Sequence, residues 1–204
     1  RSLHKANLLP AIIFVFSRSG CDAAVNQLLN TDLVLTSQQE ARHLRRIAQL
    51  HGEGLTDEER RAVGWTHFVA AFERGIAAHH AGLLPVIKAI VEEGFVAGLL
   101  KVVVATETLA LGINMPARTV VLEKLVKYNG QTHADITPGE YTQLTGRAGR
   151  RGIDTQGHAV VCWQPGMDPR AVAGLASRRT YPLNSAFVPT YNMAVNLVGS
   201  MGQI

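Results

Sequence analysis

The chain has 204 residues, of which 47% are hydrophobic and 18% are charged. This length and apolar content support one sizeable core, which excludes an intrinsically disordered protein and a long coiled coil. The net charge of +4 permits a nucleic-acid or phosphate partner without requiring one. No apolar run approaches the roughly 18–20 residues of a membrane span, and residues 1–5 lack a signal-peptide pattern. We therefore expect a cytoplasmic location and no membrane partner.

Short apolar runs alternate with helical patterns along the chain. Residues 11–16 (AIIFVF), 101–105 (KVVVA) and 158–163 (HAVVCW) are predicted strands, and their unbroken apolar character predicts burial on both faces. Residues 21–29 and 84–93 have helical patterns. This alternation predicts an α/β fold in which a parallel β-sheet has helices on both faces.

A helical elaboration is predicted over residues 31–64. Thr56 and Glu59 have the spacing of a capping box, in which each side chain satisfies a free backbone N–H at the start of a helix, so a helix is expected from Asp57. The alternative is that residues 57–60 (DEER) form a DExx magnesium motif. Such a motif ends an apolar strand and this one does not, which favours the helix start.

The two cysteines and the paired histidines bear on metal binding. Cys21 and Cys162 lie far apart and outside any metal-ligand spacing, so reduced thiols are expected. His79 and His80 are adjacent, and neighbouring residues on a strand point to opposite faces, so they cannot bind one ion together. No metal site is predicted.

Arginine and glycine interleave in residues 143–152 (QLTGRAGRRG). On a helix, Gln143, Arg147 and Arg150 share one face. Glycine inside a helix costs about 1 kcal/mol relative to alanine, so the glycines suggest that a ligand approaches the backbone closely. Guanidinium groups bind phosphate oxygens through paired hydrogen bonds, which makes a polyanion the expected ligand. The alternative is a solvated basic turn.

The same segment carries a family resemblance. The pattern Q-x-x-G-R-x-G-R-x-G in residues 143–152 resembles the sixth signature motif of superfamily 2 helicases, in the form found in the DExH group of superkiller-like exosome helicases. Residues 12–19 (IIFVFSRS) resemble motif IV, residues 78–83 (AHHAGL) motif IVa and residues 105–116 (ATETLALGINMP) motif V. Residues 191–197 (YNMAVNL) resemble the segment that opens the winged-helix domain. The excess of arginine over lysine resembles the actinobacterial members.

The resemblance implies a domain organisation. Residues 1–166 are expected to form the second of two RecA-like domains, and residues 167–204 a linker and the start of a winged-helix domain. In this family ATP and Mg²⁺ are bound mainly by the first RecA-like domain. The chain has no G-x-x-x-x-G-K-[ST] phosphate loop and no strand-terminal DExH motif. By itself it is expected not to hydrolyse ATP, and to be part of a longer helicase.

The resemblance also implies residues that face the nucleotide. They are Gln143, Arg147 and Arg150 as catalytic residues, and Gly112, Asn114 and Gly146 as nucleotide-binding residues. Arg150 and Arg147 are expected to contact the γ-phosphate in the role of an arginine finger. Gln143 is expected to couple the nucleotide to the domain interface.

A second group of residues is expected to contact the backbone of a single nucleic-acid strand. It comprises Ser17, Arg18, His80, Gly82, Thr106 and Thr108. Short hydroxyl side chains and backbone N–H groups after a strand can hold a phosphate without reading sequence. Structural alternatives remain open: Thr106 or Ser17 caps a following helix, Arg18 is merely solvated, and His79 is a buried, hydrogen-bonded histidine.

The predicted function is therefore the second motor domain of an ATP-dependent nucleic-acid helicase. RNA is favoured by the resemblance, and the expected partners are a single strand and the first RecA-like and winged-helix domains of the same polypeptide. The alternatives are a DNA-repair helicase of the same superfamily and a non-catalytic RecA-like binding module. The intact set of Gln143, Arg147 and Arg150 argues against the module.

Overall fold

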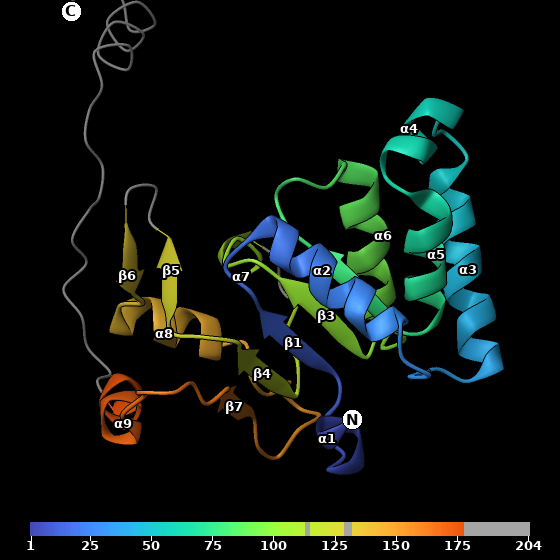
Figure 1. Cartoon of the computed structure of the whole chain (residues 1–204). Helices are drawn as coiled ribbons and strands as arrows, with labels where there is room; N and C mark the ends of the chain where they lie inside the picture. The colour runs from blue at the N-terminus through green and yellow to red at the C-terminus, as the bar shows by residue number, and fades with distance from the viewer. Residues whose placement is uncertain (113–114, 129–131, 178–204) are drawn as a thin grey trace, which may run out of the picture.

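The computed structural model describes residues 1–112, 115–128 and 132–177. A parallel sheet of five strands in the order β2-β3-β1-β4-β7 lies at its centre (Figure 1). The strands of this sheet are β1 (Ala11–Phe14), β2 (Ile76–His79), β3 (Val102–Ala105), β4 (Thr119–Leu122) and β7 (His158–Val161). An antiparallel hairpin of β5 (Val126–Tyr128) and β6 (His133–Asp135) stands apart from the sheet.

Helices connect the strands. Their bounds are α1 (Ser2–Lys5), α2 (Arg18–Leu29), α3 (Gln38–Gly52), α4 (Asp57–Ala62), α5 (Trp65–Glu73), α6 (Pro85–Val96), α7 (Leu109–Gly112), α8 (Pro138–Thr145) and α9 (Pro169–Ser177). None of these helices is long and apolar enough to cross a membrane.

The register of the sheet brings the carboxyl ends of its strands to one edge. Ala11 at the start of β1 pairs with Val102 of β3 and with Thr119 of β4, and all pairs in the sheet are parallel. Because β2, β3 and β1 are neighbours, the loops that leave their carboxyl ends lie next to one another. In open parallel sheets this edge is where ligands bind.

The sheet is covered on both faces, as the alternation of strands and helices predicts. On one face the β1 residue Ile13 and its neighbours pack against Cys21 and Val25 of α2. On the other face Phe14 belongs to a core that also contains Leu44 of α3 and Ile90 of α6. Figure 1 shows α2 on one side of the sheet and α3, α5 and α6 on the other. The predicted α/β class is confirmed.

Two of the predicted strands are buried as expected and one is not. Every residue of β3 is buried, and β1 is buried except for the partly exposed Ile13. In β7 none of the four residues is fully buried, because β7 lies at the edge of the sheet and pairs only with β4. The predicted two-sided burial of this strand is therefore wrong.

The helix start at Asp57 is confirmed. The Thr56 side chain accepts a hydrogen bond from the Glu59 backbone N–H at 3.2 Å, and the Glu59 carboxylate accepts one from the Thr56 N–H at 2.9 Å. Residues 57–60 therefore form the first turns of α4 and are not a magnesium motif.

Residues 169–177 form α9, although the composition from residue 167 onward predicts a linker. Helix α9 contacts α8, and Leu175 of α9 packs against the core that contains Phe14. The predicted winged-helix segment, residues 191–197, lies outside the described residues.

Candidate nucleotide and nucleic-acid site

The residues predicted to contact a nucleic-acid strand occupy three adjacent loops. Ser17 and Arg18 follow β1, His80 and Gly82 follow β2, and the loop of Thr106 follows β3. The fold therefore brings together, along one edge of the sheet, residues that are far apart in the sequence.

Ser17 has the structural role that was its alternative. Its side chain accepts a hydrogen bond from the Gly20 backbone N–H at 3.0 Å and so caps α2. Arg18 is exposed, and its stem lies against the loop after β2. A Cβ atom at Gly82 would lie 3.2 Å from Cδ of Arg18, so the glycine lets the two loops approach closely.

His80 shapes the loop after β2. Its Nδ1 accepts a hydrogen bond from the Gly82 backbone N–H at 3.2 Å, so Nε2 carries the proton and faces Asp22 Oδ1 of α2 at 3.2 Å. The side chain of His80 is 6% exposed. It presents its loop, and not an open imidazole ring, to the surface.

His79 points to the opposite face of the sheet, as predicted for a neighbouring residue on a strand. Its Nε2 lies 2.9 Å from Glu92 Oε1 of α6, while its buried Nδ1 has no hydrogen-bond partner among the described residues. Burial lowers the pKa of His79, with Glu92 acting in the other direction. His79 is thus the buried, hydrogen-bonded histidine of the alternative interpretation.

The two threonines of the loop after β3 differ in exposure. Thr106 is buried and Thr108 is exposed, and their hydroxyl oxygens are 2.9 Å apart. The backbone carbonyl of Thr106, not its hydroxyl, accepts the hydrogen bond from the Leu109 N–H that starts α7. Thr106 therefore orients Thr108, whose side chain is the one that faces solvent.

The predicted helical face of Gln143, Arg147 and Arg150 is wrong. Helix α8 ends at Thr145, and Arg147 and Arg150 lie in the turns that follow. A helix cannot continue there because Ala148 forms a parallel bridge with Ala117, whose carbonyl accepts a hydrogen bond from the Gly149 N–H at 2.7 Å.

The glycines of this segment serve the chain's own backbone. Gly149 has a φ of +92°, a left-handed conformation that favours glycine, and a Cβ there would lie 3.2 Å from the Cα of Gly157. A Cβ at Gly157 would lie 2.5 Å from the carbonyl of Ala148. The close approach expected of a ligand is made at these positions by a neighbouring loop.

Both arginines are held by specific partners. Arg147 donates a hydrogen bond through Nη2 to the backbone carbonyl of Ala110 in α7. Arg150 forms a bidentate pair with Asp154, from Nε at 2.8 Å and from Nη2 at 2.9 Å. These contacts exclude the solvated basic turn.

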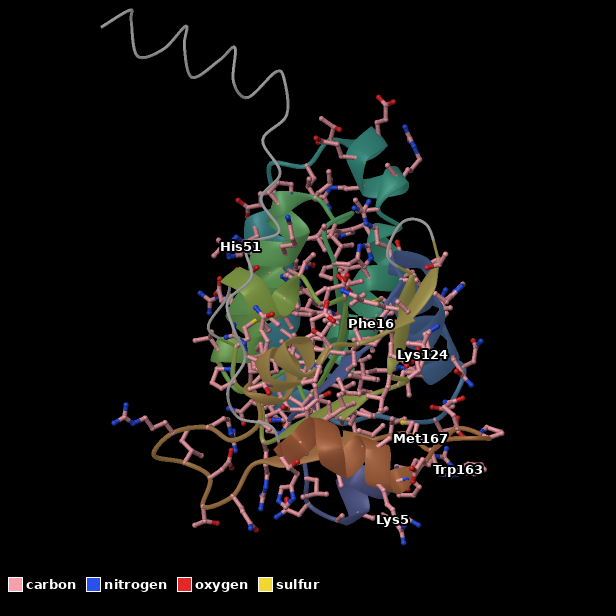
Figure 2. The ribbon with its side chains drawn as sticks, turned by 90° about the vertical axis from the view of Figure 1, so that its left-hand side faces the viewer. Lys5, Phe16, His51, Lys124, Trp163 and Met167 are labelled. Carbon is pink, nitrogen blue, oxygen red and sulfur yellow. The ribbon has the colours of Figure 1, made fainter. Side chains whose placement is uncertain are left out.

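Gln143 borders a cavity of about 220 Å³ where three motif-bearing segments meet. Phe16, which precedes Ser17, and Glu107, which precedes Thr108, also line it. Figure 2 labels Phe16 near the middle of the molecule. Gln143 is exposed and borders the same cavity as the segments after β1 and β3.

The remaining nucleotide-side predictions concern glycines and one asparagine. Gly112 is the last residue of α7, and Gly146 is the exposed residue that caps the end of α8. Asn114 lies outside the described residues.

Sequence reasoning missed two carboxylates of the site. Asp154 pairs with Arg150 at a separation of four residues, which is itself a readable signal. Asp22 faces His80 across the chain, and nothing in the local sequence announces that contact. Within residues 1–112, 115–128 and 132–177, no group of three or more His, Cys, Asp or Glu side chains could hold a metal ion.

Comparison with known proteins identifies the family that part of the chain matches. Residues 65–152 match the family "Helicase conserved C-terminal domain", a range that contains the loops after β2 and β3 and the arginine segment. The chain contains a helicase C-terminal domain.

Relatives of this helicase domain come from bacteria and animals. The chain is 59% identical over 200 residues to "Probable helicase HelY" of Mycobacterium tuberculosis, covering 98% of this chain and 22% of that protein. It is 39% identical over 198 residues to human "Exosome RNA helicase MTR4", covering 97% of this chain and 19% of that protein. It is 39% identical over 201 residues to human "Superkiller complex protein 2", covering 97% of this chain and 16% of that protein. The chain thus spans about a fifth of these relatives.

Proposed function

We propose that this domain is the second motor domain of an ATP-dependent nucleic-acid helicase. The observation that carries the proposal is the hydrogen bond from Arg147 to the carbonyl of Ala110. It joins the arginine segment, which bears the residues expected at the nucleotide, to α7, which follows directly after the exposed Thr108. A motor domain needs such a connection, because the state of the bound nucleotide must change the affinity for the nucleic-acid strand.

On the nucleotide side, Arg150 and Arg147 contact the γ-phosphate, and Gln143, Gly112, Asn114 and Gly146 line the same interface. The guanidinium groups fit this role since two of them lie on one loop, and Arg150 keeps N–H donors beyond those used for Asp154. Hydrolysis of ATP bound with Mg²⁺ would supply the free energy for helicase activity. The first RecA-like domain of the same polypeptide holds most of both, since this chain has no phosphate loop.

On the side that faces the nucleic-acid strand, Thr108, Gly82 and Arg18 contact phosphates directly. The side chains of Thr106, His80 and Ser17 stabilise the conformation of their loops. Hydroxyl, backbone and arginine contacts to phosphate carry no base information, so the binding is independent of sequence. RNA is the favoured substrate because human MTR4 is named an RNA helicase. The winged-helix domain of the same polypeptide contacts the next part of the bound nucleic-acid strand. The protein acts in the cytoplasm.

Replacing Arg150 in the full-length protein tests this function. Arg150→Ala is expected to lower kcat for nucleic-acid-stimulated ATP hydrolysis by about a hundredfold or more and to change KM for ATP much less, because a finger contact strengthens in the transition state. The control is Arg45→Ala, which removes an exposed arginine paired with Glu73 far from the site. An unchanged kcat in Arg150→Ala contradicts the proposal.

A further inference from the structure

Arg150 does not carry its charge alone. The Asp154 carboxylate accepts hydrogen bonds from Nε, Nη2 and the backbone N–H of Arg150, the last at 3.0 Å. Its side chain is only 4% exposed. Three hydrogen bonds from one residue fix both the backbone and the guanidinium plane of Arg150, which is what a finger must have before it meets a phosphate.

The same pairing has an electrostatic cost. A guanidinium and a carboxylate joined in a bidentate pair carry no net charge, whereas a γ-phosphate in transfer is stabilised by positive charge. Asp154 therefore orients Arg150 and at the same time cancels most of its attraction for phosphate. Arg147, on the same loop, is one further positive charge, and a cation close to Asp154 would replace the charge that the pair loses.

Arg118 precedes β4 and carries a further positive charge. Its backbone lies beside the arginine segment, because the preceding residue, Ala117, bridges Ala148. The Nε of Arg118 is buried and has no hydrogen-bond partner among the described residues. Its charge also contributes to holding the pKa of Asp154 down at about 2, after the larger effect of Arg150 itself.

We propose that Arg150, Asp154 and Arg118 act as one unit of net charge +1, in which Asp154 is the positioning residue for Arg150 and Arg118 restores the positive charge that Asp154 cancels. This inference rests on the proposed function, since it takes Arg150 to be the phosphate contact. The inference adds Asp154 and Arg118 to the residues that act on the nucleotide. The spacing of residues 143–152 does not indicate a role for Arg118.

The test uses ATP hydrolysis by the full-length protein with single-stranded RNA. Asp154→Asn is expected to lower kcat about tenfold or more with little change in KM for ATP, because the guanidinium loses its fixed orientation. Arg118→Gln is expected to lower kcat to a similar extent, and Arg118→Lys to restore most of it, because lysine keeps the charge. Glu73→Gln is the matched control, since it disrupts the exposed bidentate pair of Arg45 and Glu73.

The double variant separates this unit from independent structural roles. When Asp154→Asn has already removed the cancelling charge, Arg118→Gln is expected to cause a further loss of less than about twofold, since energies of coupled residues do not add. The same loss from Arg118→Gln in both backgrounds overturns the proposal. So does equal activity of the Gln and Lys variants at position 118.

Two further measurements keep the outcome readable. If Asp154→Asn lowers Tm so far that the protein is unfolded in the assay, the Gln and Lys variants at position 118 decide the question alone. Arg150→Ala is measured alongside. A normal kcat in Arg150→Ala defeats the proposed function itself, whereas a loss there combined with a normal kcat in Asp154→Asn defeats only this inference.

Discussion

The guanidinium of Arg147 donates a hydrogen bond to the carbonyl oxygen of Ala110, which lies in α7 and 37 positions earlier in the chain. The bond joins the turn after α8 to the helix that follows the loop of Thr106 and Thr108. Since Thr106 and Thr108 share a hydroxyl contact, we expect a displacement of Arg147 to reach the surface proposed to contact nucleic acid through a short path of direct contacts.

Loss of this hydrogen bond should uncouple ATP hydrolysis from RNA binding in the full-length protein. Arg147→Ala is expected to reduce the ratio of RNA-stimulated to basal ATPase rates by about tenfold, the scale of a hydrogen bond to a charged group. RNA affinity without nucleotide should change little. Steady-state ATPase assays with and without RNA give the ratio, and Arg45→Ala is the control. An unchanged ratio would show that Arg147 does not couple the two sites.

The loops after β1 and β3 should differ in how salt affects their contribution to RNA binding. Thr108→Ala is expected to weaken binding of all RNA sequences equally and to leave the slope of log affinity against log salt unchanged, because threonine releases no counterion. Arg18→Gln should reduce that slope by about 0.7. Fluorescence anisotropy at several salt concentrations measures both. A flattened slope in Thr108→Ala would mean that the substitution has displaced a charged neighbour.

The sequence predicts the parts of this domain whose causes are local. The apolar run at residues 11–16 and the capping box of Thr56 and Glu59 both appear as expected. Strand β2 has the composition IAAH, which is too poor in β-branched residues to stand out. Its strand conformation comes from pairing with β3, a contact made across the chain.

The arginine segment shows where local reasoning fails. Its spacing suits a helix. The helix nevertheless ends at Thr145 because the bridge between Ala148 and Ala117 draws the chain away. Pairing with a distant segment overrides local periodicity, and only the folded chain contains that information.

His79 should make the stability of this domain depend on pH. Burial lowers its pKa below the ordinary value of about 6.5, so the unfolded chain takes up a proton at a higher pH than the folded one. The stability that the neutral form provides is present above about pH 6.5 and is lost as the pH falls towards the folded pKa. His79→Gln should flatten this dependence.

Denaturant unfolding of the chain and of His79→Gln between about pH 7.5 and pH 5.5 measures the effect. His51→Gln is the control because His51, although it also faces a glutamate, is far more exposed, at 33% of its side chain. Parallel curves for the chain and for His79→Gln would exclude His79 as the source of the pH dependence.

Gly157 should tolerate no side chain. A Cβ there would lie 2.5 Å from the carbonyl of Ala148, which is backbone and cannot rotate away. Gly157→Ala is expected to lower the free energy of unfolding by about 1–3 kcal/mol, the scale of overpacking. Gly54→Ala is the control, since a Cβ at Gly54 meets nothing within 4 Å. Equal stability of the two variants would show that the loop moves without cost.

The place of β1 in the sheet has a consequence for synthesis on the ribosome. Among the strands of this sheet β1 is made first, yet it is central and pairs with β3 and β4, which begin at Val102 and Thr119. At about 5–20 residues per second, the unpaired backbone N–H and C=O groups on its two edges wait several seconds for their partners. During that interval β1 is a template for pairing with any other extended chain. A nascent chain paused shortly after residue 100 should therefore be more prone to aggregate than one released after β4.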